Sequence, residues 1–128
     1  MLVDTLGLAP VVQVQPAREQ DRCGAGPVLQ EAARRQPDLR VVWADGGYSG
    51  PLAAGAAPPG CQLRIVPKPA GAKTFAVLPR RWVVERPFAW LSRYRRLGTR
   101  DLETMPQSSR AWILVAMIHL MTRRLHPT

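Results

Sequence analysis

Three carboxylates lie in sequence contexts where an acid commonly acts in catalysis or metal binding. Asp45 ends a short apolar run and precedes Gly46 and Gly47. Glu85 lies among arginines and tryptophans in a segment with helical periodicity, and Asp4 lies in the opening apolar stretch. Hard cations such as Mg²⁺ prefer oxygen ligands, and two such ions about 4 Å apart support phosphodiester chemistry. The three acids therefore form a candidate two-metal site.

Each acid taken alone also has a simpler explanation. Asp45 suits an Asp-Gly turn, and Asp4 suits the end of a strand. Glu85 can pair with Arg81 one helical turn earlier, although a helix that needed only salt bridges would carry more than one acid among so many arginines. The combination favours a shared site, because a sheet and a later helix can bring distant carboxylates to one point.

The charge of the chain favours a polyanionic partner. The net charge is +9, and residues 64–110 carry eleven of the eighteen Lys and Arg against three acids. Charge so unevenly placed is typical of nucleic-acid-binding proteins. Trp82 falls on the polar side of its predicted helix, where it would stack on an unpaired base or pack against a neighbouring helix.

Two other classes of protein are disfavoured. Cys23 and Cys61 form no CxxC pair, which argues against a zinc site or a disulfide framework and fits a reducing cytoplasm. The longest apolar run, residues 111–121, is interrupted by His119 and is shorter than the ~20 residues that span a bilayer. We expect no membrane association.

Periodicity predicts the elements that would position the acids. Residues 1–14 form two short extended runs, and residues 49–60, rich in Pro, Gly and Ala, suit a loop or a broken helix. The remaining predicted elements are a helix over 23–36, strands over 41–44, 63–66 and 75–78, and helices over 80–97 and 107–125. Strands followed by helices, with a strand–helix–strand unit among them, predict an α/β sandwich.

On these elements the acids take definite places. Asp4 lies on a strand, Asp45 at the end of a neighbouring strand, and Glu85 on the polar arc of a helix. Pro87 interrupts that helix and implies either a later start or a kink beside Glu85. The last helix is apolar nearly all round, which is typical of a helix covered by a core or by a partner.

Four segments carry a resemblance to a known family. They are LVDTLGL at 2–8, the Pro-Ala…Gln-Asp-Arg pattern at 16–22, ADGGY at 44–48 and VLPRRWVVERPFAWLSRYRRL at 77–97. On these segments residues 2–125 closely resemble bacterial insertion-sequence transposases of the DDE type, in the insertion sequence five group. The resemblance implies an α/β, RNase H-like fold with a central mixed sheet flanked by helices, and a cytoplasmic, nucleoid-associated protein.

The resemblance also implies roles for single residues. Asp4, Asp45 and Glu85 match the catalytic acids that bind two Mg²⁺ or Mn²⁺ ions, and Arg81 matches the arginine four residues before the glutamate. The residues expected to contact DNA are Arg80, Arg81, Trp82, Arg86, Arg93 and Arg96.

The chain departs from the family pattern in places. Leu78 and Ser92 stand where the wider signature has a tyrosine and a basic residue, and only three residues precede Asp4. We expect a single catalytic domain over residues 1–128, truncated at its N-terminus, with an incomplete first strand and without the region that recognises the element's ends. Such a chain would be a second reading frame or a decayed copy, with reduced or no activity of its own.

Three functional hypotheses follow. The leading one is a transposase that cuts element ends and joins them to target DNA, as a homo-oligomer or with an upstream-frame product. The second is a non-catalytic basic fragment that binds nucleic acid or a full-length transposase. The third is an RNase H-like nuclease, which would cut without joining. Metal dependence separates the second hypothesis from the other two.

Overall fold

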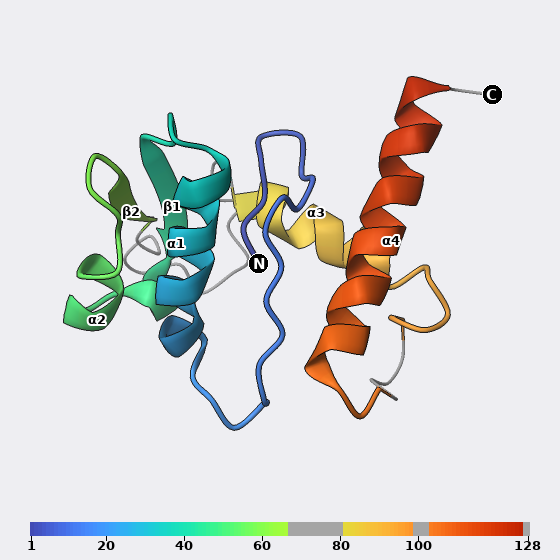
Figure 1. The fold of residues 1–128 in the computed structure, drawn as a ribbon, viewed down its shortest axis with the longest axis horizontal. Coiled ribbons are helices and arrows are strands. Elements are labelled where there is room, and N and C mark those ends of the chain that lie inside the picture. Colours follow the sequence, from blue (N-terminus) through green and yellow to red (C-terminus); the bar gives the residue numbers. More distant parts are fainter. Residues whose placement is uncertain (67–80, 99–102, 127–128) are drawn as a thin grey trace, which may run out of the picture. The chain divides into compact units, whose positions relative to one another are not determined.

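The computed structural model describes residues 1–66, 81–98 and 103–126 of the chain. Its helices and strands follow in the order α1 (Ala25–Arg35), β1 (Val41–Asp45), α2 (Pro51–Ala54), β2 (Gln62–Val66), α3 (Arg81–Leu91) and α4 (Pro106–Leu125) (Figure 1). Short 3-10 turns at Asp21–Gly24 and Gly46–Tyr48 precede α1 and follow β1. The chain divides into two compact units, Met1–Val14 with Trp82–Thr128, and Gln15–Arg81.

The unit Gln15–Arg81 is built on a parallel pair of strands. Strand β1 pairs with β2 in a register that runs from Val41 opposite Gln62 to Asp45 opposite Val66. Parallel strands need a crossover connection, and residues 46–61 supply it with the short helix α2. The predicted strands 41–44 and 63–66 are confirmed to within one residue, whereas the predicted strand 75–78 lies outside the described residues.

Helix α1 confirms most of the helix predicted over residues 23–36. Its apolar side chains recur at helical spacing, and Leu29 and Ala32 are buried. On its exposed side Glu31 accepts hydrogen bonds from Arg34 and Arg35. These bonds lower the pKa of the Glu31 carboxyl from 4.5 to about 2. The unit thus combines a helix with a two-stranded sheet, and the larger mixed sheet predicted from the sequence is not seen among the described residues.

The N-terminal residues do not form the predicted strand. Leu2 and Val11 make one isolated antiparallel bridge, and Asp4 lies in a tight turn between them. The Asp4 amide donates to the Leu8 carbonyl at 2.8 Å, and Gly7, at a φ of 80°, lets the chain reverse. The prediction that Asp4 lies on a strand is therefore wrong. An aspartate side chain that bonds to nearby amides competes with the ladder of a sheet, which favours a turn.

Helix α3 is shorter than predicted. It begins at Arg81, as the sequence suggests, but it ends at Leu91 rather than near residue 97. Pro87 lies inside the helix and is fully buried. Beyond Leu91 the chain continues through turns, in which the Ser92 hydroxyl donates to the Ala89 carbonyl at 2.9 Å. The helix therefore contains the proline and does not start after it.

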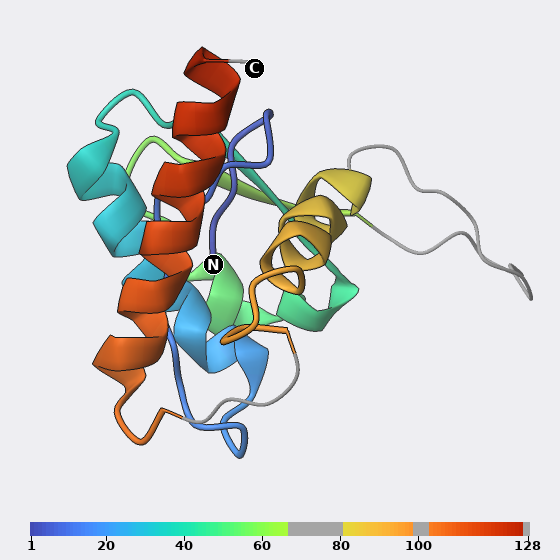
Figure 2. The same cartoon turned by 90° about the vertical axis from the view of Figure 1, so that its right-hand side faces the viewer.

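Helix α4 matches its prediction to within one residue at its start, and packs on one side. The core of its unit joins Ala9 and Val12 to Leu91, Ala116 and Met117. On α4, Trp112, Val115 and Ile118 are exposed, so the core of the unit covers one side of this apolar helix, and cover of the other side by a partner stays a prediction. Figure 2 shows the helix along its length. No helix among residues 1–66, 81–98 and 103–126 is long and apolar enough to cross a membrane.

The turn at Gly7 gives a stability prediction. The left-handed backbone costs a residue with a Cβ about 1–2 kcal/mol, so Gly7→Ala should lower the free energy of unfolding by at least that amount. Urea unfolding followed by tryptophan fluorescence measures the change. Gly46→Ala is the matched control, because a Cβ there meets nothing within 4 Å and it should change stability by about 0.5 kcal/mol or less. Equal stabilities for Gly7→Ala and the parent would contradict the turn.

Candidate functional site

The Asp4 carboxylate is held by the main chain of its own turn. Its Oδ1 accepts hydrogen bonds from the amides of Leu6 and Leu8, each at 2.8 Å. Within the described part of the chain its Oδ2 accepts no hydrogen bond, and the side chain is exposed. A carboxylate fixed through one oxygen leaves the other oriented toward solvent, where a cation or a donor can reach it.

The Asp45 carboxylate is held in a similar way at the end of β1. Its Oδ1 accepts from the Gly47 amide at 2.9 Å and so caps the 3-10 turn Gly46–Tyr48. Ser49 closes the same turn, because its hydroxyl donates to the Gly46 carbonyl at 2.7 Å. A Cβ at Gly47 would lie 3.0 Å from Asp45 Oδ1, so this position suits glycine. The predicted place of Asp45, at the end of a strand before a glycine turn, is confirmed.

Tyr48 lies close enough to Asp45 for the charge of that carboxylate to affect its pKa. Burial raises the pKa of the Tyr48 phenol, and the negative charges of Asp21 and Asp45 raise it further. The phenol therefore stays neutral well into alkaline solution. Asp21 and Tyr48 are neighbours of the candidate acid that sequence reasoning did not place there, although both belong to the segments that carry the family resemblance.

Glu85 lies exposed on α3, on the helix predicted for it. The next residue, Arg86, donates through Nη2 to the Leu6 carbonyl at 2.7 Å. Leu6 belongs to the turn that holds Asp4, so the helix that carries Glu85 contacts the turn that carries Asp4. The structure thus brings together the elements of two of the three predicted acids.

The third acid belongs to the other compact unit, since Asp45 lies within Gln15–Arg81. In the described ranges no three His, Cys, Asp or Glu side chains group to hold a metal ion. The donor chemistry nevertheless fits a hard divalent cation, because all three residues are carboxylates and the main chain orients two of them. A metal site made of all three stays a prediction.

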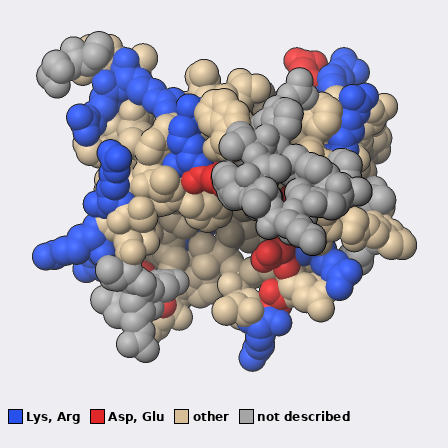
Figure 3. Space-filling view, turned by 180° about the vertical axis from the view of Figure 1, so that it is seen from behind, with Lys and Arg blue, Asp and Glu red and all other residues tan. Residues whose placement is uncertain are grey.

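The basic residues predicted to contact DNA differ in their surroundings. Arg80 and the side chain of Arg81 lie outside the described part of the structure. Trp82 is 47% exposed, as its position on the polar arc predicts, and Arg86 lies over its ring at 4.6 Å. Arg93 is exposed. Figure 3 shows Lys and Arg side chains reaching the surface of the molecule.

Arg96 is engaged within its own unit. Its Nη1 lies 2.6 Å from Glu103 Oε1, and its guanidinium lies 4.7 Å from the centre of the Trp112 ring. An arginine with an ion pair and a stacked ring would have to exchange the ion pair to bind a phosphate. Contact of these residues with DNA stays a prediction.

The surroundings of Tyr48 allow a titration test. Asp45→Asn should lower the pKa of Tyr48 part of the way toward 10, because it removes a negative charge that disfavours the phenolate. Asp21→Asn should lower it at least as far, and neither change should remove the effect of burial. Phenolate absorbance in a Tyr94→Phe background measures the shift. Asp38→Asn, an exposed acid of the same unit, should leave the pKa unchanged.

The comparisons with known proteins extend these observations. Among curated proteins and among solved structures, no match to the chain was found. A family model described as Transposase DDE domain matches residues 1–121, a range that includes Asp4, Asp45 and Glu85. Proteins of that family have an RNase H-like fold and generally use divalent metals. Because the match covers nearly the whole chain, the chain belongs to the Transposase DDE domain family.

Proposed function

We propose that the chain is the catalytic portion of a transposase of the insertion sequence five group. It cuts DNA at the ends of its element and joins the resulting 3′-hydroxyl to target DNA. The observation that carries the proposal is the family match over residues 1–121, which spans all three candidate acids. The net charge of +9 supports a DNA partner.

Asp4, Asp45 and Glu85 are the residues that would hold the metal. When bound, two Mg²⁺ or Mn²⁺ ions activate the attacking oxygen and stabilise the leaving one. The contribution of the chain is to keep the carboxylates oriented before the ions arrive. The amides of Leu6 and Gly47 do this, because each holds one carboxylate oxygen and leaves the other to the cation.

The DNA-contacting surface is proposed from the same family signature. It comprises Arg80, Arg81, Trp82, Arg86, Arg93 and Arg96, which lie on both sides of Glu85 along one segment of the chain. Phosphate contacts would come from the arginines, and Trp82 is exposed enough to stack on an unpaired base. The protein would act in the bacterial cytoplasm at the nucleoid, as a homo-oligomer or with an upstream-frame product.

Metal-dependent cleavage tests the proposal directly. The purified chain is incubated with Mn²⁺ and DNA that carries the ends of its element, beside Asp4→Asn, Asp45→Asn and Glu85→Gln. Each substitution should lower the rate of cleavage at least about a hundredfold, because loss of a metal ligand removes several kcal/mol of transition-state stabilisation. Each should also weaken Mn²⁺ binding measured by calorimetry, a readout that holds even where cleavage is slow.

The controls separate the competing functions. Asp38→Asn removes an exposed acid from the unit that contains Asp45, and should leave cleavage and Mn²⁺ binding unchanged. Cleavage without joining would indicate the nuclease. DNA binding with neither Mn²⁺ binding nor cleavage would indicate the non-catalytic fragment, and cleavage that survives all three acid substitutions would contradict the proposed site.

A further inference from the structure

Two arginines from distant parts of the chain converge on one backbone carbonyl. Arg86, on α3, donates through Nη2 to the carbonyl of Leu6 at 2.7 Å. Arg124, near the end of α4, brings Nη1 and Nη2 each to 3.5 Å from the same oxygen. All three residues belong to the unit formed by Met1–Val14 and Trp82–Thr128. The turn at Leu6 is therefore held from outside by two helices.

The Arg86 side chain is confined between two rings of its own helix. Its guanidinium lies 4.6 Å from the centre of the Trp82 ring and 4.9 Å from that of Trp90. These residues stand one helical turn before and after it, so the rings flank the side chain along α3. Its Nε is buried and has no hydrogen-bond partner among the described residues. Its hydrogen bond to the protein runs from Nη2 to the Leu6 carbonyl.

Gly7 makes room for this arrangement. A Cβ at Gly7 would lie 3.1 Å from Nη2 and 3.2 Å from Nε of Arg86, and 3.3 Å from the Trp90 ring. Those distances are tighter than ordinary van der Waals contacts. The turn therefore needs a residue without a side chain at the point where the guanidinium lies against it.

The backbone of Leu6 links Arg86 to the Asp4 carboxylate through its carbonyl and its amide. The Leu6 carbonyl accepts from Arg86, and the Leu6 amide donates to Asp4 Oδ1 at 2.8 Å. One residue therefore stands between the guanidinium and the carboxylate. An arginine that fixes the Leu6 peptide also limits the positions open to the Asp4 side chain, and that arginine directly follows Glu85 in the chain.

We infer that Arg86 is a positioning residue that clamps the Asp4 turn against α3 and so couples the positions of Asp4 and Glu85. The catalytic part of this inference rests on the proposed function. The clamp takes the place of the DNA contact proposed above for Arg86, because it commits the guanidinium to a carbonyl and two rings within the protein. The other residues of that surface are unaffected.

Amide exchange and Mn²⁺ titration of the whole chain test the clamp without requiring activity. In Arg86→Gln, the Leu6 and Leu8 amides should exchange with solvent at least about tenfold faster, while amides within α4 keep their protection. The Mn²⁺ concentration that half-broadens these amide signals should rise several-fold. Arg86→Lys should restore part of the protection, because lysine can donate to Leu6 but lacks the planar group that stacks on the rings.

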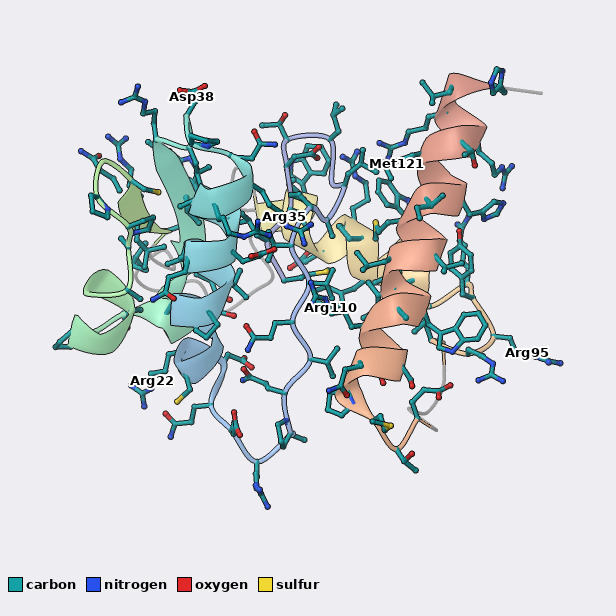
Figure 4. All side chains as sticks on the ribbon, in the orientation of Figure 1. Arg22, Arg35, Asp38, Arg95, Arg110 and Met121 are labelled. Carbon is teal, nitrogen blue, oxygen red and sulfur yellow. The ribbon has the colours of Figure 1, made fainter. Side chains whose placement is uncertain are left out.

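Two further variants separate the clamp from the loss of a charge. Arg95→Gln removes one positive charge from the same unit, from a side chain that extends away from the ribbon (Figure 4), and should leave the two amides unchanged. Gly7→Ala keeps every charge but crowds Arg86, and should accelerate exchange at Leu6 and Leu8 as Arg86→Gln does.

Cleavage kinetics complete the test. If Arg86 positions the acid, Arg86→Gln lowers kcat at least about tenfold, raises the Mn²⁺ requirement, and leaves KM for DNA and the salt dependence of binding unchanged. Two results together would overturn the clamp: unchanged exchange rates of the Leu6 and Leu8 amides, and a salt dependence of DNA binding reduced by about one phosphate contact. They would indicate that Arg86 contacts DNA. Altered amides in a chain that shows no Mn²⁺-dependent cleavage would uphold the clamp and reject the proposed function.

Discussion

The hydrogen bonds around Leu6 are the constraint on which the N-terminal part of the molecule depends. The Leu6 amide faces the Asp4 carboxylate, and its carbonyl faces Arg86. Without those bonds, residues 1–14 would be joined to each other by one isolated bridge and a few turn contacts. Packing then adds to what the bonds define, because Ala9 and Val12 join the core formed with α3 and α4.

Asp4 and Asp45 make the same kind of local hydrogen bond, although one lies in a turn and the other ends a strand. Each uses Oδ1 to accept the amide two residues further along, Leu6 in one case and Gly47 in the other. An aspartate held this way keeps a defined rotamer, since the short side chain has few ways to reach that amide. The same bond that makes each acid a good turn residue also makes it a preoriented ligand. The structural and the functional explanations of these residues are therefore compatible.

Local patterns predicted the elements that depend on local chemistry. Strand β1 and helix α4 match their predicted ranges closely, because β-branched runs and a long apolar segment after Pro106 identify them. The Asp4 turn was missed although the Asp-x-x-Gly spacing of residues 4–7 is a turn signal, because the flanking apolar residues suggested a strand. The role of the Leu6 carbonyl could not be read from the sequence. Its partner is Arg86, 80 residues away, and no local pattern encodes such a contact.

Arginine stacking has a consequence for how the chain meets a polyanion. Each of the four tryptophans has a guanidinium over its ring, supplied by Arg64, Arg86, Arg96 and Arg124. A cation held against an indole has given up part of its water, and some of these arginines also hold a protein acceptor. An arginine that stays engaged within the protein neutralises no phosphate and so releases no counterion from the polyanion. The salt dependence of binding therefore counts the cationic side chains that reach a phosphate, and the formal charge of +9 does not give that number.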